Sequence, residues 1–259
     1  KYDFSNHLYF LNGFVFNEIG VKNKTTVNAP TFSKTLKNVL LKHALFSELE
    51  YKKKNTYARF GARLNYFSKF NKFIFEPRIN IRQKINTSFS AKLEAEFKNQ
   101  TTTQKIDFQD NFLGIEKRRW VLSDDKNIPV LISKQASFGL EYSKKSWYLD
   151  LTGFIKKVDG ISLANQGFYN NTQTLNSKGN YKTKGVEFLV NKKINKISTW
   201  LSYTYALNNY TFNNLTPSTF ANTLDVTHSA SSALNYSFSK NLKLSLGAVL
   251  RSGTPYTKP

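Results

Sequence analysis

NTSFSAKLEAEFKN, Asn86 to Asn99, alternates apolar and polar residues from Phe89 onward. Successive side chains of an extended chain point to opposite faces, so this stretch predicts a β-strand with one apolar and one charged face. The apolar face consists of Phe89, Ala91, Leu93, Ala95 and Phe97, and the polar face of Ser88, Ser90, Lys92, Glu94, Glu96 and Lys98. The fold class then depends on whether the apolar face contacts a soluble core or lipid.

The same alternation recurs in other segments, most clearly in Thr56–Phe67, Gln135–Tyr142, Ser146–Ile155, Lys184–Asn191, Ile197–Ala206 and Asn241–Arg251. We count about eleven strands of roughly 9–13 residues, against about 5–6 residues for a usual soluble strand. In the interior of the ten clearest strands the apolar face carries no Asp, Glu, Lys or Arg. A lipid-facing surface requires this, because a Lys or Arg near the bilayer midplane costs roughly 2–4 kcal/mol.

The predicted connections alternate between short turns and long links. The short turns are Lys52–Asn55, Lys84–Asn86, Ser143–Ser146, Lys192–Asn195 and Ser239–Asn241, and the long links are Asn17–Leu41, Phe67–Pro77, Asn99–Ser133, Lys157–Lys182 and Asn208–Thr227. Tight turns at one rim and long loops at the other are typical of outer-membrane barrels.

Aromatic residues near the predicted strand ends point the same way, since such barrels carry aromatic girdles at both membrane interfaces. These residues are Tyr51, Tyr57, Tyr66, Tyr142, Trp147, Tyr203, Tyr205, Tyr236 and Phe238. The sequence therefore predicts an all-β fold, an antiparallel up-and-down transmembrane β-barrel. A soluble sheet with an apolar inner face produces the same binary pattern and is the alternative.

Three stretches resemble the barrel of TonB-dependent outer-membrane receptors of the Bacteroidetes type. They are YKTKGVEFLVNKKINKISTWLSYTYALNNY (Tyr181 to Tyr210), NTLDVTH (Asn222 to His228) and LGAVLRSGTPYTKP (Leu246 to Pro259). FEPRINIRQKIN (Phe75 to Asn86) resembles a mid-barrel strand of the same family. These are structural motifs, so they indicate the family rather than a substrate.

The resemblance implies a barrel of about 22 strands closed by an N-terminal plug, in the bacterial outer membrane. It also implies import of a scarce nutrient, such as a siderophore, cobalamin, glycan or peptide, driven through TonB. We therefore expect residues 1–259 to be a fragment of the barrel domain, without the plug and the closing strands. The implied partners are the protein's own plug, TonB through the plug, outer-membrane lipid and lipopolysaccharide, with a surface lipoprotein as a further candidate.

The formal net charge of +21 and the pI near 9.9 indicate an anionic partner or surface. The lysines are concentrated in turns and loops. They can be solvated residues that discourage edge pairing, or they can attract lipopolysaccharide phosphates. A nucleic acid is not the expected partner, because the aromatic residues alternate away from the charges instead of sharing a platform with them.

Charged residues on the predicted lumen face are the first candidate site. They are Glu48, Arg59, Arg63, Arg78, Arg82 and Glu94. The turn at Lys52–Asn55 is expected to bring Glu48 close to Arg59. The set can be mutually compensating ion pairs of little energetic consequence, or a polar docking surface for the plug.

Residues in the predicted long loops are the second candidate site, because binding residues favour loops on a rigid scaffold. The substrate-contacting candidates are Arg118, Arg119, Trp120, Phe168, Tyr169, Asn170 and Tyr210. Their aromatic rings and amides suit stacking on a sugar, peptide or siderophore. Ordinary loop packing explains the same residues.

The sequence contains no catalytic motif, and His7, His43 and His228 lack metal-ligand spacing. We expect no enzymatic activity, no metal and no cofactor. Two other functions stay open: a passive porin or structural barrel, and a soluble β-rich binding module. Dependence on detergent separates the barrel from the soluble module.

Overall fold

The computed structural model describes residues 2–107, 117–162, 177–222 and 225–255. In this part of the chain no helix has the length and apolar character needed to cross a membrane. One antiparallel sheet of 13 strands contains nearly all of the structure, and β7 and β8 form a separate two-stranded hairpin. The predicted all-β, antiparallel fold is therefore confirmed.

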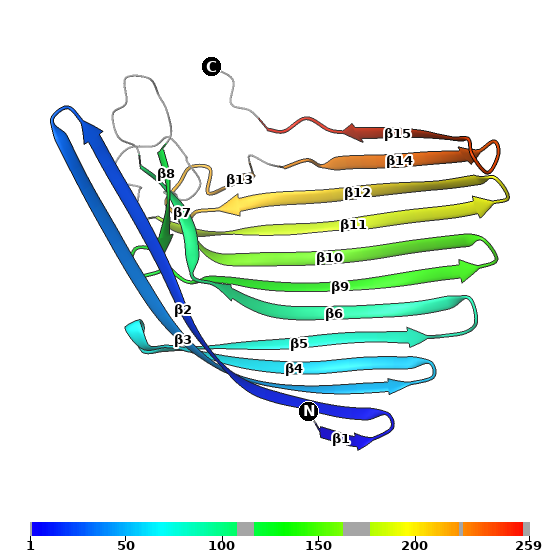
Figure 1. The fold of residues 1–259 in the computed structure, drawn as a ribbon, viewed down its shortest axis with the longest axis horizontal. Coiled ribbons are helices and arrows are strands. Elements are labelled where there is room, and N and C mark those ends of the chain that lie inside the picture. The colour runs from blue at the N-terminus through cyan, green and yellow to red at the C-terminus, as the bar shows by residue number, and fades with distance from the viewer. Residues whose placement is uncertain (1, 108–116, 163–176, 223–224, 256–259) are drawn as a thin grey trace.

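The sheet is an up-and-down meander in which most strands pair with their sequence neighbours (Figure 1). The path runs β1-β2-β3-β4-β5-β6-β9-β10-β11-β12-β14-β15, and β13 pairs with β12. The elements are β1 (Tyr2–Ser5), β2 (Leu8–Asn28), β3 (Thr31–Lys53), β4 (Thr56–Phe67), the short 3-10 helix η1 (Ser68–Phe70), β5 (Lys72–Lys84), β6 (Phe89–Gln100), β7 (Thr102–Asp107), β8 (Lys117–Leu122), β9 (Leu131–Lys144), β10 (Trp147–Ser162), β11 (Lys178–Ile194), β12 (Ile197–Thr211), β13 (Thr219–Ala221), β14 (His228–Ser237) and β15 (Lys243–Arg251).

The predicted tight turns all lie at one end of the strands, on the right of Figure 1. The predicted long links lie at the other end, but two of them were wrong. Phe67–Pro77 is only the η1 turn followed by β5, and Asn17–Leu41 is not a loop. The link Asn99–Ser133 contains the β7–β8 hairpin, and the link Asn208–Thr227 contains β13.

Residues 18–28 of β2 and 31–41 of β3 form a two-stranded arm. The β3–β4 pairing begins only at Lys42 and Phe67, whereas β2 and β3 stay paired out to Asn28 and Thr31. At about 3.3 Å per residue the arm is about 35 Å long. It leaves the sheet at the rim that carries the long connections (Figure 1).

The two faces of the sheet differ in the way that the sequence predicts. One face exposes large apolar side chains in the middle of the strands, including Leu93 (41% exposed), Phe138 (53%) and Leu246 (58%). The other face buries polar groups, among them Asn65, Glu76 and Glu141. A soluble sheet would cover its apolar face, so these exposures favour a face built to contact lipid.

Aromatic contacts cross the strands on the exposed apolar face near both rims. Near the long-loop rim, Phe16, His43, Tyr66 and Phe73 form a row from β2 to β5, with ring centroids 5.0, 6.2 and 4.7 Å apart in succession. Near the tight turns, the rings of Phe89 and Tyr142 lie 4.9 Å apart, and Nζ of Lys192 lies 4.0 Å from the Trp147 ring centroid. Such rows suit the two interfaces of a bilayer.

Among the described residues, tightly buried apolar clusters lie near the long-loop rim. The first consists of Leu40, Phe67, Ile74, Leu122 and Val130, and it joins the base of the arm to β4, β5, β8 and the segment before β9. The second consists of Val158, Ile161, Tyr210 and Phe212. These clusters fasten the rim connections to the sheet and leave the polar face open along the strands.

Candidate functional site

A cavity of about 980 Å³ is lined by the polar face of the sheet. Its lining side chains come from strands as far apart as β3, which contributes Glu48, and β12, which contributes Asn208 and Tyr210. The sheet therefore curves around this cavity. Cationic, anionic and amide side chains share the lining, which suits a water-filled interior better than an apolar core.

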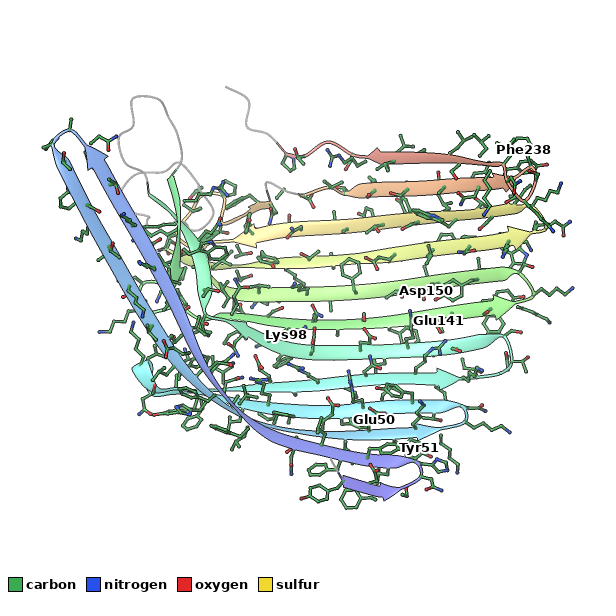
Figure 2. The ribbon with its side chains drawn as sticks, in the orientation of Figure 1. Glu50, Tyr51, Lys98, Glu141, Asp150 and Phe238 are labelled. Carbon is green, nitrogen blue, oxygen red and sulfur yellow. The ribbon has the colours of Figure 1, made fainter. Side chains whose placement is uncertain are left out.

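The centre of the polar wall is an ion-pair network across β5, β6, β9 and β10. Glu141 and Asp150 are directly opposite each other in the β9–β10 pairing. Nζ of Lys92 lies 2.5 Å from Asp150 and 3.5 Å from Glu141, and Nε of Arg82 donates to Glu141 at 2.9 Å. Tyr148 adds hydroxyl contacts to both carboxylates at 3.4 Å. Figure 2 shows Glu141 and Asp150 on their neighbouring strands.

Gly139 makes this network possible. Gly139 is paired with Lys92 on β6 and with Thr152 on β10, so it lies between the Lys92 ammonium group and the Asp150 carboxylate. A Cβ atom at Gly139 would lie 2.6 Å from Oγ1 of Thr152 and 2.9 Å from Cε of Lys92. The missing side chain is therefore the gap through which Lys92 crosses β9 to Asp150.

The sequence could have revealed more of this network, of which only Arg82 was among the predicted site residues. The tight turn at Ser143–Ser146 fixes the register that sets Glu141 against Asp150. Like charges directly opposite each other destabilise a sheet, which predicts a cation between them. Lys92 could not be predicted as that cation, because it comes close to Glu141 and Asp150 only when β6 pairs with β9 and the β7–β8 hairpin is left out of the sheet.

The six predicted lumen residues all lie on the polar face, but they do not form one ladder. Nη1 of Arg59 lies 3.6 Å from Glu48, as expected from the turn. Glu48, Arg59, Arg78 and Glu94 line the cavity together. The Arg63 guanidinium instead donates to Asn65 at 3.0 Å, and Arg82 belongs to the Glu141 network.

The predicted loop candidates are positioned differently from the expectation. Arg118, Arg119 and Trp120 lie on strand β8, and the Trp120 carbonyl accepts a hydrogen bond from Nδ2 of Asn23 at 2.9 Å. Tyr210 lies in β12, only 4% exposed, and packs in the aromatic cluster at the cavity rim. The prediction that these residues lie in loops was therefore wrong. Phe168, Tyr169 and Asn170 lie outside the described residues.

The connection between β8 and β9 is pinned by charged side chains. The Asp124 carboxylate accepts backbone hydrogen bonds from Lys126 and Ile128 at 2.9 and 2.8 Å, and Lys72 binds Asp125 at 2.6 Å. Burial acts to raise the pKa of Asp124, but the backbone donors outweigh it and hold that pKa below its ordinary value. In the described part of the chain, no three His, Cys, Asp or Glu side chains are grouped to hold a metal.

A curved antiparallel meander with an apolar outer face and a charged wall around a cavity is the architecture of a transmembrane β-barrel. No protein-family model and no curated protein matches the sequence. Solved structures do match it. The FrpB iron transporter from Neisseria meningitidis (F3-3 variant) is 10% identical with a TM-score of 0.65, over 96% of this chain and 40% of that one.

Two further structures agree. The siderophore receptor PirA from Pseudomonas aeruginosa is 16% identical with a TM-score of 0.58, over 96% of this chain and 47% of that one. The RagAB peptide transporter is 11% identical with a TM-score of 0.59, over 96% and 39%. The chain thus spans less than half of each structure that it matches, and its fold is that of part of a TonB-dependent receptor barrel.

Proposed function

We propose that residues 1–259 are part of the barrel of an outer-membrane transporter that imports a scarce nutrient with energy coupled through TonB. The observation that carries this proposal is the separation of the two faces. Leu93 and Phe138 are exposed on the apolar face, while the neighbouring Lys92 and Glu94 line the cavity on the other. Such a sheet can bound an aqueous path through a membrane.

The polar wall is proposed to dock a plug. Its ion pairs are partly exposed, and several of its charged groups face the cavity. Arg78 is exposed and lines the cavity, and it forms no ion pair with any described residue. A plug that offers carboxylates and amides can exchange hydrogen bonds with such a wall and still be released, because exposed ion pairs are individually weak.

The plug proposal is tested by reversing the charge of Arg78 and Arg82 together in the full-length protein. We expect the plug to be retained less well and nutrient uptake to fall, with the double variant K53E/K54E at a tight turn as the charge-matched control. Unchanged plug retention and uptake in the double variant would assign these arginines to the barrel wall alone.

For the nutrient, we propose that the β7–β8 hairpin contributes contacts at the entrance. Trp120 is 51% exposed at the rim that carries the long connections. Tyr210 is buried and is proposed to shape the cavity wall instead of touching the ligand. Trp120→Ala is expected to weaken substrate binding at unchanged surface expression, and equal affinity of variant and wild type would remove Trp120 from the entrance.

The transport proposal is tested by uptake in cells that express the full-length protein, with and without TonB. We expect uptake of the transported nutrient to require TonB. Uptake that continues unchanged without TonB would show a passive porin. A full-length protein that is soluble and monodisperse without detergent would instead support the soluble binding module.

A further inference from the structure

The lysines of the β2–β3 arm are arranged by face. In the β2–β3 register Lys22 is directly opposite Lys37, and Lys24 is the next residue on the same face, opposite Thr35. Asn23, between the two lysines of β2, donates to the carbonyl of Trp120 on β8. Because neighbouring side chains of a strand point to opposite faces, Lys22, Lys24 and Lys37 point away from β8. We call these three residues the arm lysines.

The face that carries the arm lysines continues the apolar outer face of the same hairpin. Phe14 and Phe16, 59% and 52% exposed, precede Lys22 with the same alternation on β2, and on β3 Leu41 follows Lys37 on the side toward the sheet. From Leu41 to Lys37 is about 13 Å along the strand. The outer face therefore changes from apolar to cationic within the distance that separates the hydrocarbon edge from the headgroups.

The arm lysines lack anionic partners within the described structure. Residues 19–47 contain Lys22, Lys24, Lys34, Lys37 and Lys42 and no Asp or Glu. No acidic side chain of the described residues forms an ion pair with the arm lysines, which are all exposed. Glu18, at the base of the arm, is the nearest acid on this face of β2. Two lysines placed directly opposite each other repel, and a bound anion would relieve that repulsion.

We infer that the arm lysines form a binding site for the phosphate groups of lipopolysaccharide in the outer leaflet. Three ammonium groups on neighbouring positions of one ribbon face match a headgroup that carries more than one phosphate. The long-loop rim, where the arm leaves the sheet, is the outer rim of such barrels. The inference rests on the proposed outer-membrane location, and it assigns the arm a lipid partner in addition to the transport function.

The test uses the full-length protein and phosphatidylcholine vesicles that contain diphosphoryl lipid A. The triple variant K22Q/K24Q/K37Q is compared with wild type and with Lys34→Gln. Lys34 is opposite Thr25, on the other face of the same arm, so it shows the effect of removing one positive charge from the arm without touching the proposed site. Heat-modifiable migration in gels and TonB-dependent uptake check that each variant is folded.

At about 5-fold for each lysine near an anionic surface, we expect the triple variant to bind lipid A roughly 100-fold more weakly than wild type. Lys34→Gln should bind lipid A within about 2-fold of wild type, because Lys34 points away from the proposed site and contributes less than the about 5-fold of each arm lysine. Equal binding by wild type and triple variant would overturn the inference, as would an equal loss in Lys34→Gln. Vesicles with phosphatidylglycerol or dephosphorylated lipid A in place of lipid A should bind more weakly, and equal binding to either would show that the lysines do not select its phosphates.

The uptake measurement keeps the two proposals separate. TonB-independent uptake together with lysine-dependent lipid A binding would refute the transport proposal and support the lipid site. Normal TonB-dependent uptake together with lipid A binding that does not depend on the arm lysines would support the transport proposal and refute the lipid site.

Discussion

Replacing Leu93 with lysine is expected to destabilise the membrane-inserted protein far more than placing a lysine on the opposite face. Leu93 lies on the apolar face of β6, 41% exposed, between Ile81 and Phe138 on the neighbouring strands. It is about 13 Å along the strand from Phe89, whose ring contacts Tyr142 near the tight-turn rim.

An apolar band about 25 Å tall then places Leu93 close to the midplane, where the penalty for a lysine is greatest. The expected loss is therefore in the upper part of the range of about 2–4 kcal/mol, that is about 3–4 kcal/mol or an equilibrium change of roughly 150- to 900-fold. The cost arises because hydrocarbon cannot solvate the ammonium group.

Ser137→Lys is the matched control. Ser137 lies on the polar face of β9, lines the cavity and is paired with Glu94, so a lysine there would meet both water and a carboxylate. We expect its free energy of unfolding to change by less than about 1 kcal/mol.

The assay is reversible urea unfolding of the full-length protein in lipid vesicles, followed by tryptophan fluorescence. Equal losses in Leu93→Lys and Ser137→Lys would refute the assignment of the two faces.

Three further predictions follow from local contacts. Gly139→Val should break the Lys92–Asp150 contact without unfolding the sheet, because the added side chain occupies the path of the flexible Lys92 side chain. In NMR spectra, the Lys92 ammonium resonance of the variant should then differ from that of wild type. Leu40→Ala, at a fully buried position, should cost about 2–5 kcal/mol and speed hydrogen exchange in the arm, whereas Leu36→Ala, 45% exposed, should leave exchange at the arm's base unchanged. The pKa of Asp124 is lower in the folded protein, so its carboxylate stabilises the β8–β9 connection above the unfolded pKa of about 4, and this stability should be lost as the pH falls through the folded pKa. The loss should appear as faster cleavage of the connection by pepsin. Asp124→Ala should be cleaved at the faster rate already at about pH 5, where the wild-type carboxylate is still ionised.

The strands and tight turns could be predicted because the membrane imposes its pattern on each strand separately. Lipid on one face and water on the other give every crossing strand a period of two, which is visible in Phe89–Lys98 without knowledge of any neighbour. Tight turns then fix local registers such as that of β3 with β4, which brings Arg59 within 3.6 Å of Glu48.

The arm could not be predicted by the same rule, because it lies beyond the apolar face. Its outer face carries Lys22, Lys24 and Lys37 where a crossing strand would carry apolar residues, so the segment resembles a polar loop. In the structure the two strands satisfy each other's backbone hydrogen bonds, and Leu40 anchors their base in a buried cluster.

The candidate site could be predicted only in part, for a topological reason. The residue types and their face follow from alternation, but partners on non-consecutive strands do not. Lys92 contacts Asp150 through the gap at Gly139, a contact that requires the order β6-β9-β10 to be known. Tyr210 falls in the predicted long link Asn208–Thr227, whereas strand β12 continues through it to Thr211.

The most direct test of the account is to find which side chains touch lipid. Residues 1–259 contain no cysteine, so Leu201→Cys and Ser202→Cys each add one site for a nitroxide spin label to this part of the protein, and any cysteine elsewhere in the full-length protein is replaced by serine. These neighbours in β12 point to opposite faces, with Leu201 44% exposed on the apolar one. In the full-length protein in vesicles, we predict that the label at 201 is relaxed by oxygen dissolved in the lipid and the label at 202 by a water-soluble nickel complex. The reverse pattern, or the same accessibility at both positions, would contradict an apolar face turned to lipid around a polar interior.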